Sequence, residues 1–140
     1  MKTLIILLVF LLSVPHQEKK KSWWTPVIEA IAKVESGGNP KAVSKNGTYI
    51  GLLQISKSLV DDVNSFVGYR KYSYQDRYNP EKSIEMFILY QKKYNPENNI
   101  DKAIRIWNGG PRYTIKGTQS YLSRVKNHVT ITNIVYNEED

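Results

Sequence analysis

The sequence contains no cysteine and only two histidines among its 140 residues. Without cysteine the chain can form neither a disulfide framework nor a thiol nucleophile, and it offers no cysteine for lipid attachment. His128 has no second ligand at metal-binding spacing, and His16 falls within the first 17 residues. We therefore expect no metal site and no cofactor, and a fold held together by packing alone.

Internal repeats, low-complexity tracts, glycine-rich phosphate loops and nucleophile elbows are also missing. Hydrophobic residues make up 41% of the chain and charged residues 24%, a balance typical of globular proteins. A chain of 140 residues is long enough for one domain with one core, but not for two substantial domains.

Residues 1–17 differ in composition from the rest of the chain. Lys2 precedes an unbroken apolar stretch from Leu4 to Leu12, the layout of a secretory leader. The stretch is shorter than the roughly 20 apolar residues of a spanning helix. Val14 and Pro15 fit a small-residue cleavage site poorly, so an uncleaved N-terminal anchor stays open as the alternative. We expect an exported protein of the periplasm or cell envelope, with its domain over residues 18–140.

The formal net charge is +7, from 20 basic and 13 acidic side chains. Cleavage of the leader would remove only Lys2, leaving 19 basic against 13 acidic side chains, or +6. A basic exported protein suits a polyanionic partner such as cell wall. A membrane surface or nucleic acid would be served equally by charge alone.

The hydrophobic periodicity predicts a mainly α domain with short connections. Thr25 is expected to cap the first helix through its hydroxyl. Residues 69–78 are predicted to be a loop, residues 40–55 are predicted to be turns with room for one small β-hairpin, and residues 129–140 fit either a strand or a docked extension. The five predicted helices are Pro26–Ser36, Lys57–Val67, Pro80–Lys93, Ile100–Trp107 and Gln119–His128.

Glu35 is the first candidate for chemistry. It follows Ile28 and Ile31 at helical spacing and lies in the last turn of its helix, at the edge of the buried face. Burial and the negative end of the helix dipole both disfavour the carboxylate, so we predict a raised pKa and a proton available near neutral pH. On position alone, a glutamate at a helix end is more often a solvated surface group.

Four sequence motifs favour a functional role for Glu35 over a solvated surface position. They are Glu-Ser-Gly-Gly-Asn-Pro at 35–40 followed by Ala-Val-Ser at 42–44, Ile-Gly-Leu-Leu-Gln-Ile at 50–55, Ala-Ile-Arg-Ile-Trp-Asn-Gly-Gly at 103–110, and the segment 121–125. In this order and spacing they resemble the catalytic domain of the soluble type of lytic transglycosylase, in the lysozyme-like superfamily. The resemblance covers residues 27–126, and the motif-bearing core is residues 26–128.

The resemblance implies a small lysozyme-like helical domain that cleaves the β-1,4 bond between N-acetylmuramic acid and N-acetylglucosamine. Glu35 would serve as acid and then as base, leaving a 1,6-anhydromuramic end. The residues implied to contact the glycan or to stand beside Glu35 are Ser44, Tyr49, Gln54, Trp107, Asn108 and Tyr121. Those implied to shape the motifs are Ser36, Gly51, Leu52, Gly109 and Gly110.

Two residues depart from the family pattern. Trp107 stands where many relatives carry tyrosine, so a hydroxyl is replaced by an indole that can only donate. Leu53 replaces a methionine of similar volume, which we expect to be tolerated.

The resemblance leaves two other functions open. One is a lysozyme-like muramidase, for which a second carboxylate is needed. Asp61, Asp62 and Asp76 are the nearest candidates, and each is better explained as a solvated charge. The other is a non-catalytic peptidoglycan-binding component of a secretion system or phage particle. In each case the implied partner is peptidoglycan and not nucleic acid, membrane contact is limited to the N-terminal segment, and the chain is expected to be a monomer.

Overall fold

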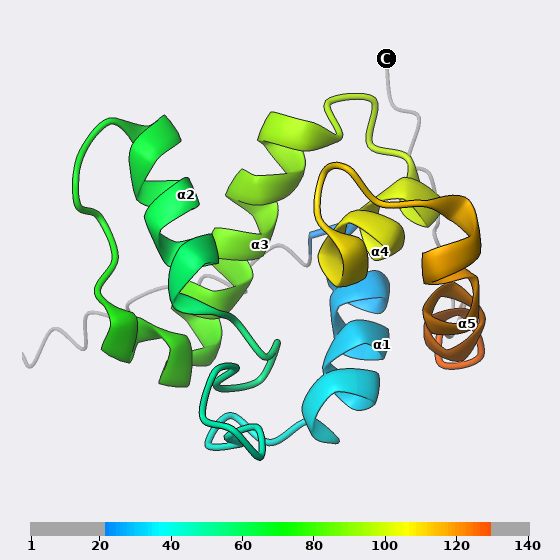
Figure 1. Cartoon of the computed structure of the whole chain (residues 1–140), viewed down its shortest axis with the longest axis horizontal. Coiled ribbons are helices and arrows are strands. Elements are labelled where there is room, and N and C mark those ends of the chain that lie inside the picture. The colour runs from blue at the N-terminus through cyan, green and yellow to red at the C-terminus, as the bar shows by residue number, and fades with distance from the viewer. Residues whose placement is uncertain (1–21, 130–140) are drawn as a thin grey trace, which may run out of the picture.

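The computed structural model describes residues 22–129, which form a helical domain (Figure 1). Its elements are α1 (Thr25–Ser36), α2 (Lys57–Val67), the 3₁₀ helix η1 (Tyr74–Tyr78), α3 (Pro80–Tyr94), α4 (Ile100–Gly109) and α5 (Ile115–Lys126). The prediction of a mainly α domain is confirmed. The predicted leader and the segment from residue 130 onward lie outside the described residues.

Three local predictions were wrong. Trp24, not Thr25, is the N-cap of α1, and no side chain caps that helix. Helix α5 begins at Ile115, four residues before the predicted start, because the Thr114 side chain accepts a hydrogen bond from the Gly117 N–H (3.1 Å). The predicted loop 69–78 ends in η1, where the Ser73 N–H donates to Asp76 Oδ2 (2.7 Å).

Within residues 22–129 there is no strand, so residues 40–55 do not form a hairpin. Two isolated antiparallel bridges, Val43 with Ile50 and Ile50 with Ile55, hold this segment instead. Tight turns at Gly47 and Gly51 let the backbone bond to itself without extending into a ladder. We call residues 44–55 the motif loop, since it carries the second family motif.

The helices form two groups that share one core (Figure 1). Helix α2 packs against α3, while α1 and α4 pack against α5. Phe87 of α3 joins the groups, because its ring lies 5.6 Å from the ring of Trp24 and 5.0 Å from that of Trp107 (centroid to centroid). Within the described residues, no helix is both long and apolar enough to cross a membrane.

The motif loop is fastened to three separate helices by side-chain hydrogen bonds. The Ser36 hydroxyl of α1 donates to the Leu52 carbonyl (2.7 Å), and the Trp107 indole of α4 donates to the Leu53 carbonyl (3.2 Å). The buried guanidinium of Arg77, in η1, donates to the Ile55 carbonyl (3.2 Å). The first two bonds satisfy loop carbonyls outside the bridges, and the third adds a second donor to the Ile55 carbonyl, which also accepts from the Ile50 N–H (3.1 Å).

Gly51 lies close against the backbone of η1. It has φ +84°, and a Cβ at this position would lie 1.8 Å from the carbonyl oxygen of Arg77. Only glycine combines that backbone conformation with that contact. Gly51 thus lets the backbone of the motif loop approach that of η1.

We predict that Gly51→Ala lowers the free energy of unfolding by about 3 kcal/mol or more, because it adds a backbone clash to an unfavourable φ. Chemical denaturation measures the change. Gly47→Ala is the matched control, since Gly47 has a similar φ of +73° and open space around it. An equal loss in the two variants would show that the contact with Arg77 costs nothing.

Candidate active site

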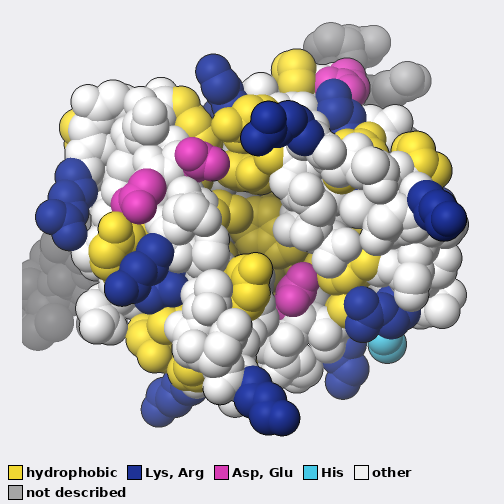
Figure 2. Space-filling view, in the orientation of Figure 1, with side chains coloured by type: hydrophobic (Ala, Val, Ile, Leu, Met, Phe, Trp, Pro, Cys, Tyr) yellow, Lys and Arg dark blue, Asp and Glu magenta, His cyan; other side chains and the backbone are white. Residues whose placement is uncertain are grey.

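A cleft of about 410 Å³ is lined by residues from both helix groups. Figure 2 shows it as a hollow near the centre of one face, with hydrophobic side chains at its floor. Residues from α1, the motif loop, α2, α3 and α4 line it: Glu35, Tyr49, Gln54, Ser56, Ser58, Leu59, Asp62, Tyr90, Ile106, Trp107, Asn108 and Gly110.

Glu35 is half-buried in the last turn of α1 and reaches the cleft from there. The buried side chains of Ile28 and Ile31 precede it on the same helix. Burial raises the pKa of Glu35 above its ordinary value of 4.5, because a charged carboxylate loses hydration there. The helix therefore presents to the cleft a carboxyl group that keeps its proton to higher pH than a surface glutamate does.

Tyr121 stands directly behind this carboxyl group. Its hydroxyl donates a hydrogen bond of 2.5 Å to Glu35 Oε1, joining α5 to α1. Tyr121 is 4% exposed and is absent from the cleft lining, so it contacts the carboxyl group rather than the open cleft. Burial, together with the neighbouring carboxylate, raises the pKa of Tyr121, so the phenol stays a hydrogen-bond donor.

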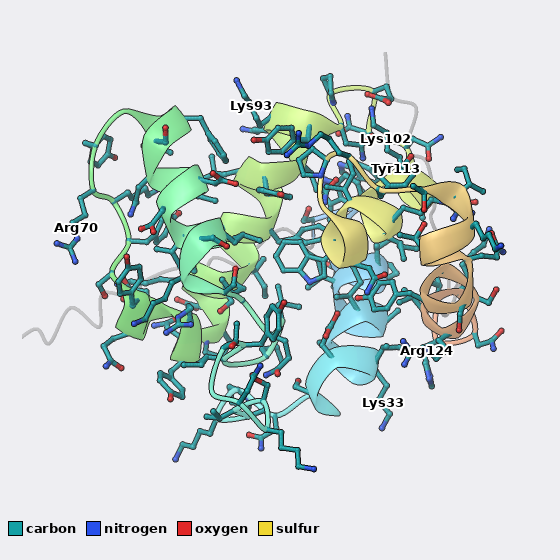
Figure 3. The ribbon with its side chains drawn as sticks, in the orientation of Figure 1. Lys33, Arg70, Lys93, Lys102, Tyr113 and Arg124 are labelled. Carbon is teal, nitrogen blue, oxygen red and sulfur yellow. The ribbon has the colours of Figure 1, made fainter. Side chains whose placement is uncertain are left out.

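Arg124 adds a positive charge to this pair. Its guanidinium carbon lies 5.6 Å from the centre of the Tyr121 ring, a cation–π contact. The hydrogen bond from Tyr121 and the charge of Arg124 both lower the pKa of Glu35, and burial outweighs them. Arg124 and Lys33 project from the same side of the molecule, from α5 and α1 respectively (Figure 3).

The structure brings most of the implied glycan contacts into one place. Tyr49, Gln54, Trp107 and Asn108 line the same cleft as Glu35. The Gln54 amide nitrogen is already hydrogen-bonded to backbone, since its Nε2 donates to the carbonyl of Gly51 in the motif loop (3.0 Å) and to that of Ala42 just before it (3.3 Å).

Ser44 lies apart from the cleft lining. Its hydroxyl donates to Asn46 Oδ1 (2.9 Å) and accepts from the Tyr49 N–H (2.9 Å). The serine therefore shapes the turn that leads to Tyr49.

The residues to which the resemblance assigns a structural role each have a contact or a backbone conformation that fits such a role. Ser36 holds the Leu52 carbonyl, and Leu52 packs at the margin of the core. Gly110 adopts φ +74° and ψ −179°, where α4 ends. A Cβ on Gly109 would lie 2.9 Å from Thr118 Cγ2, so this glycine lets α5 approach α4.

The wall formed by α2 is the part of the site that the sequence motifs miss. Ser58, Leu59 and Asp62 lie on one face of α2 at helical spacing and line the cleft. Asp62 was expected on a solvated face; it is exposed, and the surface it lies on is the cleft. The sequence predicted the helix from its apolar stripe. It did not predict that the polar residues beside that stripe line the same cleft as Glu35.

Comparison with known proteins gives the family of the chain. Residues 13–129 match the family model described as the transglycosylase SLT domain. The chain belongs to this family. The matched residues include every residue of the cleft lining, from Glu35 to Gly110, and also α5.

Curated relatives of this SLT domain include the endo-type membrane-bound lytic murein transglycosylase A of Klebsiella pneumoniae and that of Salmonella paratyphi B. Each is 40% identical over 77 residues, which make up 51% of this chain and 37% of the relative. The 70 kDa soluble lytic transglycosylase Slt70 of Escherichia coli shares the fold, with a TM-score of 0.54 and 24% identity. That match covers 75% of this chain and 17% of Slt70.

We predict that Arg124→Gln raises the pKa of Glu35, since it removes a cation that favours the charged carboxylate. Tyr121→Phe should raise this pKa as well, because a hydrogen bond to the carboxylate is lost. NMR titration of the Glu35 carboxyl carbon measures both shifts. Lys33→Gln removes an equal charge from α1 and should produce a smaller shift than Arg124→Gln. A fall in the pKa in either of the first two variants would contradict the account.

Proposed function

We propose that this SLT domain cleaves the β-1,4 bond between N-acetylmuramic acid and N-acetylglucosamine in peptidoglycan, leaving a 1,6-anhydromuramic end. The observation that carries this proposal is the half-buried Glu35 carboxyl at the cleft, with a raised pKa and a hydrogen bond from Tyr121. Family membership and the relatives named as lytic murein transglycosylases support the substrate.

Glu35 acts first as a general acid. Its proton passes to the glycosidic oxygen as the bond from that oxygen to the anomeric carbon of muramic acid breaks. The raised pKa of Glu35 makes the protonated form more favourable than it is for a surface glutamate. The charge that then develops on the carboxylate is stabilised by the Tyr121 hydroxyl and by Arg124.

Glu35 acts next as a general base. The 6-hydroxyl of the same muramic acid attacks the anomeric carbon, and its proton returns to Glu35 as the anhydro ring closes. The nucleophile belongs to the substrate, so no second carboxylate is needed to activate water. One carboxyl group thus ends the cycle in the protonation state in which it began.

The other lining residues position the glycan. We assign the exposed ring of Tyr49 and the half-buried indole of Trp107 to contacts with the faces of sugar rings. Gln54 and Asn108 present amide groups at the same cleft, suited to hydrogen bonds with hydroxyl and N-acetyl groups. Ser44 contributes indirectly, by shaping the turn before Tyr49.

A muramidase that produces reducing ends is the second candidate function. It is favoured by one observation, namely that Asp62 lines the same cleft as Glu35 and supplies a second carboxyl group. A hydrolase would use that group to activate water or to form a covalent intermediate. The chemical form of the new muramic end separates the two functions.

We place the enzyme in the cell envelope, exported by its N-terminal segment, with peptidoglycan strands as its partner. The apolar stretch in residues 4–12 and the membrane-bound relatives support this location. The positive net charge supports attraction to a polyanionic wall.

The decisive experiment is mass spectrometry of purified peptidoglycan after digestion, where we expect muropeptides with anhydro ends. Glu35→Gln should lower the rate by about 10²- to 10⁴-fold, because the acid and base are lost together. Glu29→Gln is the matched control on the same helix, since Glu29 is exposed and lies outside the cleft lining. Reducing ends alone would establish the muramidase, and an active Glu35→Gln variant would overturn the assigned role.

A further inference from the structure

The charge of the cleft differs from that of the chain as a whole. Basic residues outnumber acidic ones by 20 to 13, yet the two charged residues in the cleft lining are Glu35 and Asp62, both acidic. Figure 2 shows acidic side chains next to the central hollow, while many of the lysine and arginine side chains on that face lie toward its edge. The acidic residues favour a negative electrostatic potential in the cleft, whereas the net positive charge of the chain attracts a polyanionic polymer to the protein.

Asp62 reaches the cleft from the wall opposite the catalytic carboxyl group. It belongs to α2, one helical turn beyond Ser58, whereas Glu35 belongs to α1 on the other side of the molecule (Figure 1). The side chain is exposed, and no ion pair includes it among residues 22–129. Within this part of the chain its negative charge is available to a ligand.

Aromatic rings accompany this carboxylate. Burial, then the charges of Tyr94 and Asp62, raise the pKa of Tyr90 to about 12, so Asp62 is close enough to act on the Tyr90 phenol. The Tyr90 ring meets the Trp107 indole edge to face, with centroids 6.1 Å apart, and both residues line the cleft. A carboxylate beside aromatic rings is the combination that recognises an ammonium group in preference to a neutral or anionic one.

We propose that Asp62, with Tyr90 and Trp107, forms a specificity site for a primary ammonium group on the glycan substrate. This inference rests on the proposed function, and it adds a preference to the cleavage reaction without altering the role of Glu35. An N-acetyl amide is neutral and offers the site one N–H donor, whereas an amino sugar without its acetyl group carries a positive charge with three donors.

Two parts of peptidoglycan can supply this ammonium group. One is a glucosamine whose acetyl group has been removed, and the other is the side-chain amine of a diamino acid in a stem peptide. The shared chemistry is a primary amine that is protonated near neutral pH. Substrates that carry one of the two amines at a time distinguish the sources.

The test compares kcat/KM for three defined glycan preparations. The first is N-acetylated and stripped of peptides, the second has the same strands with glucosamine partly deacetylated, and the third is N-acetylated with peptides that bear a free side-chain amine. We expect wild-type protein to cleave at least one amine-bearing preparation about threefold to tenfold faster than the first, the scale of an exposed ion pair with aromatic contact.

Asp62→Asn should bring that ratio close to one, because it keeps the shape of the side chain and removes its charge. Asp61→Asn is the matched control. Asp61 is the neighbouring acid on α2, lies outside the cleft lining, and accepts a hydrogen bond from the Tyr74 hydroxyl (3.0 Å) that asparagine can also accept. This control should retain the wild-type ratio.

Each other outcome overturns the inference. A wild-type ratio of one would show that the amine is not recognised, and an unchanged ratio in Asp62→Asn would show that another group recognises it. An equal loss of cleavage on all three preparations in Asp62→Asn would make Asp62 a general part of the reaction. If wild-type protein cleaves none of the preparations, the proposed function itself fails, and this result is distinct from the other three.

Discussion

The candidate site depends on one hydrogen bond, from the Tyr121 hydroxyl to the Glu35 carboxyl group. It joins residues 86 positions apart in the sequence and links α5 to α1. Buried Arg105 contributes to this placement, because it donates from α4 to the Ile115 carbonyl (2.9 Å) and the Thr118 hydroxyl (2.9 Å) of α5. Gly109 allows the same two helices to approach closely. Arg105 and Gly109 thus help to hold α5, which carries Tyr121, in place against α4.

This arrangement balances opposing effects on a single proton. Burial favours the neutral carboxyl group, while Tyr121 and Arg124 favour the carboxylate. In the proposed reaction Glu35 both releases and recovers a proton, and a pKa set by opposing effects suits that role. Glu35, Tyr121 and Arg124 all lie within the residues that the SLT family model matches. The matched region makes up 37% of the named transglycosylase relative from Klebsiella pneumoniae.

Local sequence patterns predicted most helices and the position of Glu35 in the last turn of α1, because burial of an apolar stripe and helix termination are short-range effects. They failed for α5, where Gly117 in the first turn hid a start capped by Thr114. They also failed for η1, whose capping depends on Asp76 three residues after Ser73 in a tyrosine-rich stretch. The sequence could not predict that α2 lines the cleft. That depends on how α2 and α1 lie relative to one another, which is a long-range property of the fold. Ser44 shows the converse, since a motif residue implied to face the glycan is engaged within its own turn.

Trp107 contributes its ring and its N–H to different parts of the molecule. The indole lines the cleft, and its N–H is hydrogen-bonded to the Leu53 carbonyl of the loop that also carries Gln54. A sugar that pressed on the ring would therefore transmit force to that loop through a single bond. The ring in the cleft and the loop that carries Gln54 are therefore coupled, and a shift of one is expected to displace the other.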